Sequence, residues 1–276
     1  MRPAQLLSRR LALAGIAAIA LTALVPLAGS GSAAHAAETL KVGIMAGPEE
    51  EISGVAKKVA AAHGLDVQLI TFRDYALPNE ALETGDLDAN AFQHKPFLDA
   101  QIKARGYHIV SVGLTIVEPI VLYSHRIKSL AELKAGDEIG IPNDPSNGGR
   151  ALNLLAQNKV ITLAPGKGLL PTLADITANP KQLKFVELDA AQLPRSLDDL
   201  TAAVINTGYA IEAGLNPSKD GIIQEERQGN PYANFIAARE NNKDDPRIKT
   251  WVQSFQSKEV RDFLQARYKG SILPAW

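Results

Sequence analysis

The sequence has 276 residues, 46% of them hydrophobic, and a formal net charge of −1 at pH 7. This length and apolar content are sufficient for one large domain or two lobes with conventional cores. The chain contains no cysteine, which excludes disulfides, thiol catalysis and lipid attachment to a thiol. It also lacks a basic stripe with interleaved aromatic residues, so nucleic acid is not expected as a partner.

The first 36 residues have the pattern of an export signal. Basic residues at positions 2, 9 and 10 precede an Ala/Leu-rich run, and Ala34, His35 and Ala36 form a small-x-small cleavage pattern. Pro26 breaks the apolar run and no basic stop-transfer cluster follows it, which favours a cleaved signal over a membrane anchor. With no cysteine to acylate, we expect a soluble periplasmic or secreted protein without a lipid anchor.

The next segments alternate between strand and helix patterns. Short apolar runs predict strands at 40–47, 67–72, 88–92 and 108–116, and apolar residues near helical spacing predict helices at 49–64, 78–87 and 95–106. This βαβαβαβ order predicts an α/β fold in which helices cover an open, largely parallel sheet. Ligand crevices in such folds lie at the carboxyl ends of the strands.

The pattern starts again in the second half of the chain. We expect helices at 127–136, 147–161 and within 245–270, and strands at 137–144, 183–188, 200–205 and 232–240. These strands make a second sheet plausible. No low-complexity linker separates the halves, so two lobes that share a crevice fit better than independent domains.

The stretch "GDLDANAFQHKPFL", residues 85–98, contains several chemically versatile side chains. Asp86, Asp88 and His94 could transfer protons or hold a metal, whereas Phe92 and Phe97 could line an apolar pocket. The motifs G-x-S-x-G, H-E-x-x-H and G-x-x-x-x-G-K-[ST] are absent, and the histidines are scattered singly. The sequence therefore predicts neither catalytic residues nor a metal site.

A second stretch, "PNDPSNGGRALNLL" at 142–155, has the pattern of a turn followed by a helix start. Gly148 and Gly149 would let a ligand approach the backbone, where free helix N–H groups favour an anion. The helix dipole disfavours a cation in this first turn. The presence of Arg150 there is explained if its guanidinium holds a ligand carboxylate bidentately. The alternative is that Arg150 pairs with a protein acid at the surface.

Several motifs together resemble a known family. They are "FRDYALPNEAL", "GDLDANAFQHKPFL", "IPNDPSNGGRALNLL", "GLLPTLADI", "ELDAAQLPRSLDD", "AVINTGYAIEAGLNPSKDGI" and "NPYANFIAARE". In this order they are similar to the NlpA-like, methionine-binding subfamily of periplasmic solute-binding proteins of ABC importers. The resemblance implies a two-lobed type II periplasmic binding protein fold, with lobes at 38–125 plus 229–276 and at 126–228. Each lobe would hold a mixed, mostly parallel sheet flanked by helices.

The same resemblance implies a function and a set of site residues. The protein would be a non-enzymatic monomer without cofactors that binds methionine in the cleft and delivers it to a membrane permease. Aromatic faces suit a thioether, a guanidinium suits an α-carboxylate, and amides can satisfy both ends of an amino acid. The implied ligand-binding residues are Tyr75, Phe92, His94, Phe97, Arg150, Asn206 and Asn234. Asp86 and Asp88 are then expected to cap and turn the backbone.

Three alternatives remain open at this point. Within the binding class, the ligand could be another apolar amino acid or a short methionine-containing peptide. A periplasmic hydrolase would need Asp88, His94 and Glu118 to converge on a reactive water. A structural or adhesion protein would show no stabilisation by a small ligand.

Overall fold

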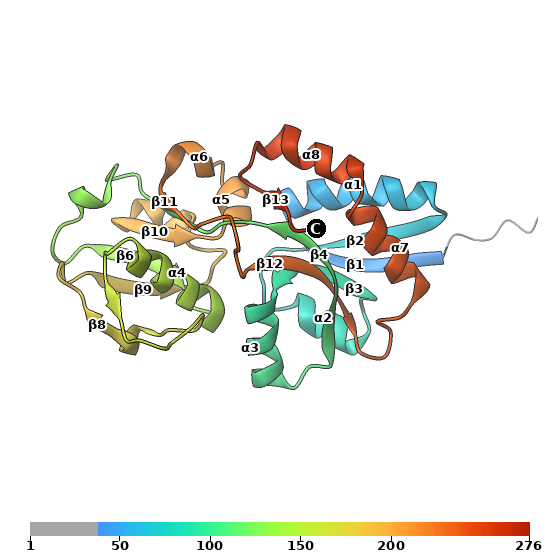
Figure 1. The fold of residues 1–276 in the computed structure, drawn as a ribbon, viewed down its shortest axis with the longest axis horizontal. Coiled ribbons are helices and arrows are strands. Elements are labelled where there is room, and N and C mark those ends of the chain that lie inside the picture. The colour runs from blue at the N-terminus through green and yellow to red at the C-terminus, as the bar shows by residue number, and fades with distance from the viewer. Residues whose placement is uncertain (1–37) are drawn as a thin grey trace, which may run out of the picture. The chain divides into compact units, whose positions relative to one another are not determined.

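The computed structural model describes residues 38–276, so the predicted signal at 1–36 lies outside the described residues. The described residues form one compact unit. Its strands build a six-stranded sheet, a five-stranded sheet and a small two-stranded ribbon, with helices packed on the two larger sheets (Figure 1). This is the α/β architecture that the alternating pattern predicted.

The six-stranded sheet has the order β13-β4-β12-β3-β1-β2. Its strands are β1 (Glu38–Met45), β2 (Leu65–Phe72), β3 (Ala89–His94), β4 (Ile109–Val117), β12 (Ala233–Arg239) and β13 (Leu273–Pro274). Strand β1 pairs in parallel with β2 and β3, whereas β12 pairs antiparallel with β3 and β4. The sheet is therefore mixed, with a larger antiparallel share than expected.

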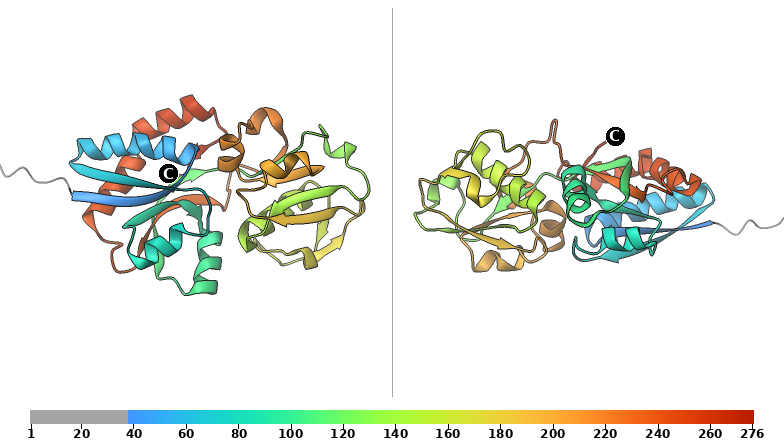
Figure 2. Two further views of the ribbon diagram at one scale, coloured as in Figure 1. Left: turned by 180° about the vertical axis from the view of Figure 1, so that it is seen from behind. Right: turned by 90° about the horizontal axis from the view of Figure 1, so that it is seen from below.

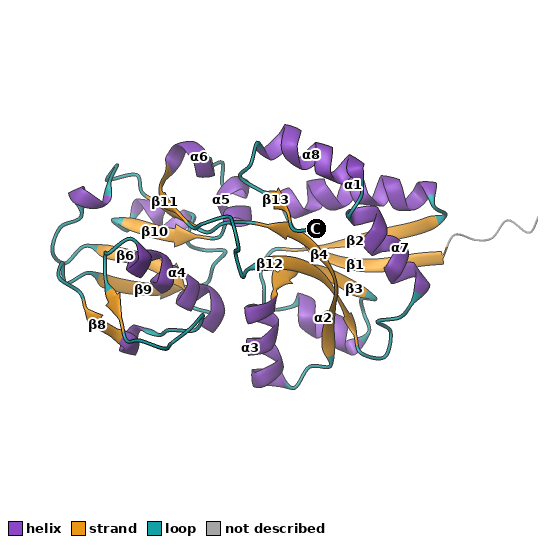
Figure 3. Cartoon of the chain, in the orientation of Figure 1, coloured by secondary structure: helices purple, strands orange, loops and turns teal. Residues whose placement is uncertain are grey.

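Helices cover both faces of this sheet (Figure 3). They are α1 (Pro48–Ala62), α2 (Pro78–Thr84), α3 (Lys95–Arg105), α7 (Pro246–Phe255) and α8 (Lys258–Tyr268). Alternate residues of β1, among them Val42 and Ile44, share a core with Trp251 of α7 and Leu264 of α8. A separate core contains residues of α2, α3 and β12. The predicted strand and helix order from β1 to β4 is confirmed.

The five-stranded sheet has the order β11-β5-β10-β6-β9. Its strands are β5 (Val121–Tyr123), β6 (Glu138–Pro142), β9 (Lys184–Leu188), β10 (Ala202–Ile205) and β11 (Gly221–Gln224). Around it lie α4 (Pro145–Gln157), α5 (Thr207–Glu212) and α6 (Pro217–Asp220). Along β10, Ala202 and Val204 join a core that contains α4, while Ala203 and Ile205 join another that contains α5. This two-residue period explains why both faces of the strand are buried.

The helix predicted at 127–136 is wrong. This segment holds only a short 3₁₀ helix, Leu130–Glu132, and Gly136 adopts a left-handed conformation with φ 84°. Its apolar residues Ile127, Leu130 and Leu133 recur every third position, which is the 3₁₀ period and not the α period. The ribbon strands β7 (Thr162–Leu163) and β8 (Ile176–Ala178) were not predicted either.

The chain crosses twice between the two larger sheets (Figure 2). It leaves the first sheet after Val117 and enters the second at Val121, and it returns between Gln224 and Ala233. The first crossing precedes the expected boundary at residue 125, because β5 pairs with β10 and β11. Among the described residues, no helix combines the length and apolarity needed to span a bilayer.

Candidate functional site

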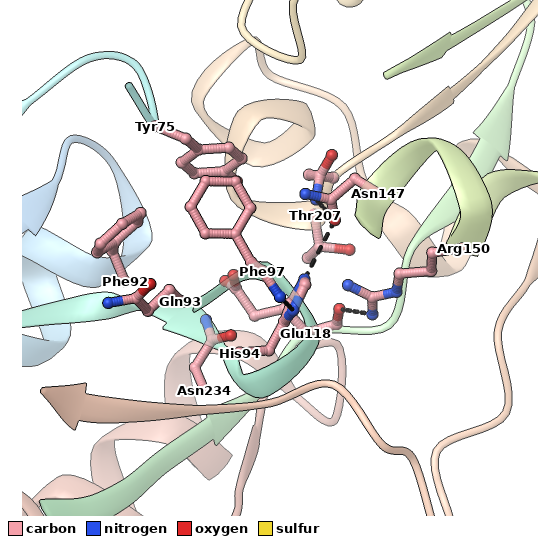
Figure 4. Close-up of a pocket in the computed structure, with 11 residues that line it drawn as sticks. Tyr75, Phe92, Gln93, His94, Phe97, Glu118, Asn147, Arg150, Thr207 and Asn234 are labelled. Atoms are coloured by element: carbon pink, nitrogen blue, oxygen red, sulfur yellow. Dashed lines mark hydrogen bonds between the residues drawn. The ribbon is translucent and has the colours of Figure 1, made fainter. Parts of the chain in front are cut away.

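One cavity lies where several strands end (Figure 4). Tyr75 follows β2, Phe92 lies within β3, His94 ends β3, and Asn206 follows β10. The structure brings all seven predicted residues to this cavity: Tyr75, Phe92, His94, Phe97, Arg150, Asn206 and Asn234. Four further lining residues were not assigned to a binding site from the sequence: Gln93, Glu118, Asn147 and Thr207. The cavity therefore occupies the position expected for α/β folds, at the carboxyl ends of strands.

Three aromatic side chains form an apolar wall. The ring centroid of Tyr75 lies 5.9 Å from that of Phe92 and 5.8 Å from that of Phe97, and the two phenylalanine rings are also 5.8 Å apart. Phe92 and Phe97 are each only 4% exposed. Rings at this spacing attract one another and offer polarizable faces to an unbranched apolar or thioether side chain.

Arg150 forms a buried ion pair with Glu225. Its Nε lies 3.0 and 3.1 Å from the two carboxylate oxygens of Glu225, and its Nη2 lies 2.5 Å from Glu225 Oε2. Nη2 also donates to the carbonyl oxygen of Glu118 at 2.8 Å, and the guanidinium stacks 4.2 Å from the ring of Tyr232. Arg150 therefore pairs with a protein acid, but inside the protein and not at the surface.

This pairing leaves one side of the guanidinium available. Arg150 is only 3% exposed and lines the cavity, yet no hydrogen bond from its Nη1 occurs among the described residues. A guanidinium presents five N–H donors in a rigid fork, so Glu225 on one edge does not block a second anion on the other. Arg150 can hold a ligand carboxylate while it also stabilises the unligated protein.

Two acceptors on the cavity wall lack protein partners. Glu118 Oε1 and Asn206 Oδ1 are both buried, and neither has a hydrogen bond among the described residues. Burial raises the pKa of Glu118 to about 7, and the positive charge of Arg150 opposes this rise. Buried polar atoms normally have partners, so this pair marks a place for a ligand group that donates hydrogen bonds.

His94 is a neutral hydrogen-bonding group in this site. Burial and, to a smaller extent, the nearby positive charge of Arg150 lower its pKa to about 3. Its Nδ1 accepts from the backbone N–H of Phe97 at 3.3 Å, and its Nε2 lies 3.2 Å from Asn147 Oδ1. Within residues 38–276 no group of three or more His, Cys, Asp or Glu side chains is arranged to hold a metal ion.

The three residues of the hydrolase alternative do not converge. His94 and Glu118 both line the cavity, but Asp88 does not. Asp88 Oδ2 accepts from the backbone N–H of Lys41 at 2.9 Å, and its other oxygen lies 3.7 Å from Arg247. Asp88 thus serves the sheet, and it does not join His94 and Glu118 at the cavity.

The expected role of the two glycines before Arg150 is wrong. A Cβ on Gly148 would lie 2.8 Å from the carbonyl oxygen of Pro142, and one on Gly149 would lie 2.7 Å from that of Leu169. Both glycines therefore let α4 pack closely against the protein's own backbone. Helix α4 contributes the side chains of Asn147 and Arg150 to the cavity lining, and neither glycine lines the cavity.

Comparison with known proteins decides the family. The sequence model of a family described as NlpA lipoprotein matches residues 40–276. The chain is 52% identical over 265 residues to the D-methionine-binding lipoprotein MetQ of Yersinia pestis, covering 95% of this chain and 97% of that protein. The chain belongs to the NlpA lipoprotein family.

Two solved structures support the fold of this NlpA family member. One is a nutrient-binding protein of Burkholderia cenocepacia bound to methionine, which is 51% identical with a TM-score of 0.84 and covers 86% of this chain and 100% of its own. The other is an ABC transporter periplasmic substrate-binding protein of Coxiella burnetii, 50% identical with a TM-score of 0.83 and the same coverage. The two-lobed type II binding-protein fold is confirmed.

Membership of the NlpA family corrects one prediction. We expected a soluble form without a lipid anchor, and that prediction is wrong, because the family and the Yersinia pestis relative are both named lipoproteins. We had expected this form because the sequence contains no cysteine. The absence of one residue type does not decide how a protein is held at a membrane.

Proposed function

We propose that this chain is the extracytoplasmic substrate-binding protein of an ABC importer and binds methionine between its two lobes. The observation that carries the proposal is the composition of one cavity: an aromatic wall, a guanidinium with a free edge, and two unpaired acceptors. These are the complements of an apolar side chain, a carboxylate and an ammonium. The relatives named above support the same assignment. They are a D-methionine-binding lipoprotein, a nutrient-binding protein bound to methionine and an ABC transporter substrate-binding protein.

Each proposed contact follows from the chemistry of the wall. The ligand carboxylate binds Arg150 Nη1, and the ammonium binds Glu118 Oε1 and Asn206 Oδ1. The thioether side chain packs among Tyr75, Phe92 and Phe97. His94 and Asn234, which face each other on paired strands β3 and β12, complete the polar lining.

The predicted lobes are 38–125 plus 229–276 and 126–228. The strand pairing supports two lobes but places β5 in the second, so the proposed first boundary moves to the crossing at 117–121. Release of methionine to a membrane permease then requires the lobes to separate. Function through binding alone, without catalysis, agrees with the substrate-binding role of the Coxiella burnetii relative.

A free amino acid fits this cavity better than a methionine-containing peptide. In a peptide the ammonium and the carboxylate belong to different residues, so they cannot both meet the groups around one methionine side chain. Here Arg150, Glu118 and Asn206 all line the cavity that holds the aromatic wall. Another apolar amino acid of similar length is the remaining competitor.

Thermal unfolding with added ligands tests the proposal. Methionine should raise the melting temperature, since a ligand that binds only the folded state adds RT ln(1 + [L]/Kd), about 4 kcal/mol at a thousandfold excess over Kd. Glycine and aspartate should act much more weakly, because neither fills the aromatic wall and aspartate would bury a second charge. Equal shifts with all three amino acids would contradict recognition of an apolar side chain.

A further inference from the structure

A chain of polar side chains with fixed hydrogen-bond directions runs from α4 to the cavity. Asp144, the N-cap of α4, accepts from the backbone N–H groups of Ser146 and Asn147 through Oδ1. Its second oxygen, Oδ2, lies 3.0 Å from Asn147 Nδ2. Asn147 Oδ1 in turn lies 2.9 Å from Asn206 Nδ2 and 3.2 Å from His94 Nε2.

Asp144 determines the direction of this chain. A carboxylate can only accept hydrogen bonds, so the Asn147 group that faces it must be the NH₂. Asn147 Oδ1 must then point the other way and can only accept. It can receive hydrogen bonds from both Asn206 and His94 only if each presents an N–H.

His94 supports this direction independently. Its Nδ1 faces the backbone N–H of Phe97 and must accept, so in the neutral ring the proton lies on Nε2. That is the nitrogen that faces Asn147 Oδ1 (Figure 4). Because Asn206 uses its NH₂ on Asn147, its Oδ1 has no partner among the described residues and remains for the cavity, which Glu118 also lines.

We propose that Asp144 is a positioning residue that makes the cavity select a ligand with an ammonium group, by turning the amides of Asn147 and Asn206 so that an acceptor faces the ligand. Asp144 itself does not line the cavity. This inference rests on the proposed function, and it adds a residue that acts on specificity without touching the ligand.

Asp144→Asn tests the proposal with almost no change in shape. Asparagine is as good an N-cap as aspartate, so α4 should still form. The introduced asparagine would cap α4 through its oxygen and turn its NH₂ toward Asn147, which would reverse the Asn147 amide. The Asn206 amide would then have to reverse too, and it would present N–H donors to the cavity. Asp245→Asn is the control, because Asp245 is also a helix N-cap, at α7, and does not line the cavity.

Titration with two ligands distinguishes a loss of amide orientation from a general loss of the binding site. For Asp144→Asn, calorimetric titration should show at least a tenfold loss of affinity for methionine. The affinity for 4-(methylthio)butanoate, which lacks the amino group, should not fall. Asp245→Asn should leave both unchanged. An equal loss for both ligands, or no loss for methionine, would overturn the proposal.

A ligand-free measurement keeps the two proposals distinguishable. Nitrogen-15 shifts of the His94 ring at pH 7 should show a protonated Nε2 that donates to Asn147 in the wild type. In Asp144→Asn the Nε2 shift should change, because a reversed Asn147 amide no longer accepts from Nε2. An unchanged Nε2 shift in the variant would overturn the role of Asp144. If the wild type fails to bind methionine while the variant shows the changed shift, the proposed function alone is refuted.

Discussion

Replacing Arg150 by alanine should weaken both ligand binding and the unligated fold. On the ligand side, the methionine carboxylate loses its counter-charge in a buried site. On the protein side, Glu225 loses the contacts of 2.5 to 3.1 Å that now neutralise it. A residue that served only the ligand would show the first effect without the second.

The structure sets the size of both effects. Removing one partner of a buried ion pair costs about 3–5 kcal/mol. The Glu225 side chain is 11% exposed and keeps hydrogen bonds from Asn230 at 2.8 Å and from the backbone N–H of Ile120 at 3.3 Å. We therefore expect the lower end, about 3 kcal/mol, which lowers the melting temperature by roughly 6–12 °C for a chain of this size. Affinity should fall by about 2–5 kcal/mol, or roughly 30-fold to several thousandfold.

Unfolding of the unligated protein and calorimetric titration of methionine measure the two effects separately. Arg267→Ala is the control, because its pair with Glu51 is about half exposed on both sides and should contribute little. Adding Glu225→Gln to Arg150→Ala should restore much of the stability, since the glutamine carries no charge, but not the affinity. An Arg150→Ala protein that unfolds like the wild type without ligand would refute the reasoning.

Two further predictions concern Glu118 and Gly148. Because the pKa of Glu118 is raised to about 7, protons compete with the ligand ammonium for this carboxylate. Titrations of methionine at several pH values should therefore show affinity falling as pH drops from 8 to 6, by at most about tenfold per pH unit. Glu118→Gln should abolish this pH dependence of the affinity. The same raised pKa means that ionising Glu118 lowers the stability of the unligated protein as pH rises from about 4.5 to 7. Gly148→Ala should lower the free energy of unfolding by about 1–3 kcal/mol, because the new Cβ meets Pro142 O at 2.8 Å. Gly54→Ala is the control, because Gly54 is partly exposed in α1 and open space lies where its Cβ would be. Measured by thermal unfolding, this variant should raise the free energy of unfolding by about 0.5–1 kcal/mol. Equal losses of stability in the two variants would contradict the packing argument.

The first half of the fold was predictable because its signals are local. Strand periods, Pro at helix starts and Gly at the ends of α2 and α3 all lie within the segments that they define. The segment at 127–136 has helix-forming residues, but its apolar positions follow a period of three, and tertiary packing kept only one 3₁₀ turn. Composition alone did not distinguish the two periods.

The site was predictable only in part. Family resemblance supplied seven lining residues, but it omitted Glu118, which had a sequence signal: it is a single carboxylate within the apolar run "LTIVEPIVLY". Glu225 had no such signal. It lies 75 positions after Arg150 in an ordinary polar segment, and only the fold brings the two together. Long-range pairs of this kind cannot be deduced from local patterns.

The position of β12 has a consequence for the order in which the molecule can fold. All strands of the five-stranded sheet lie within residues 121–224, so that sheet can form once this stretch is available. The six-stranded sheet cannot, because β12 separates β3 from β4 and begins only at Ala233. Until β12 inserts, β3 and β4 each keep an unpaired edge, the state in which chains aggregate or exchange strands. The inserted half of the chain can therefore mature first, and two late strands, β12 and β13, complete the sheet whose first strands are synthesised earliest.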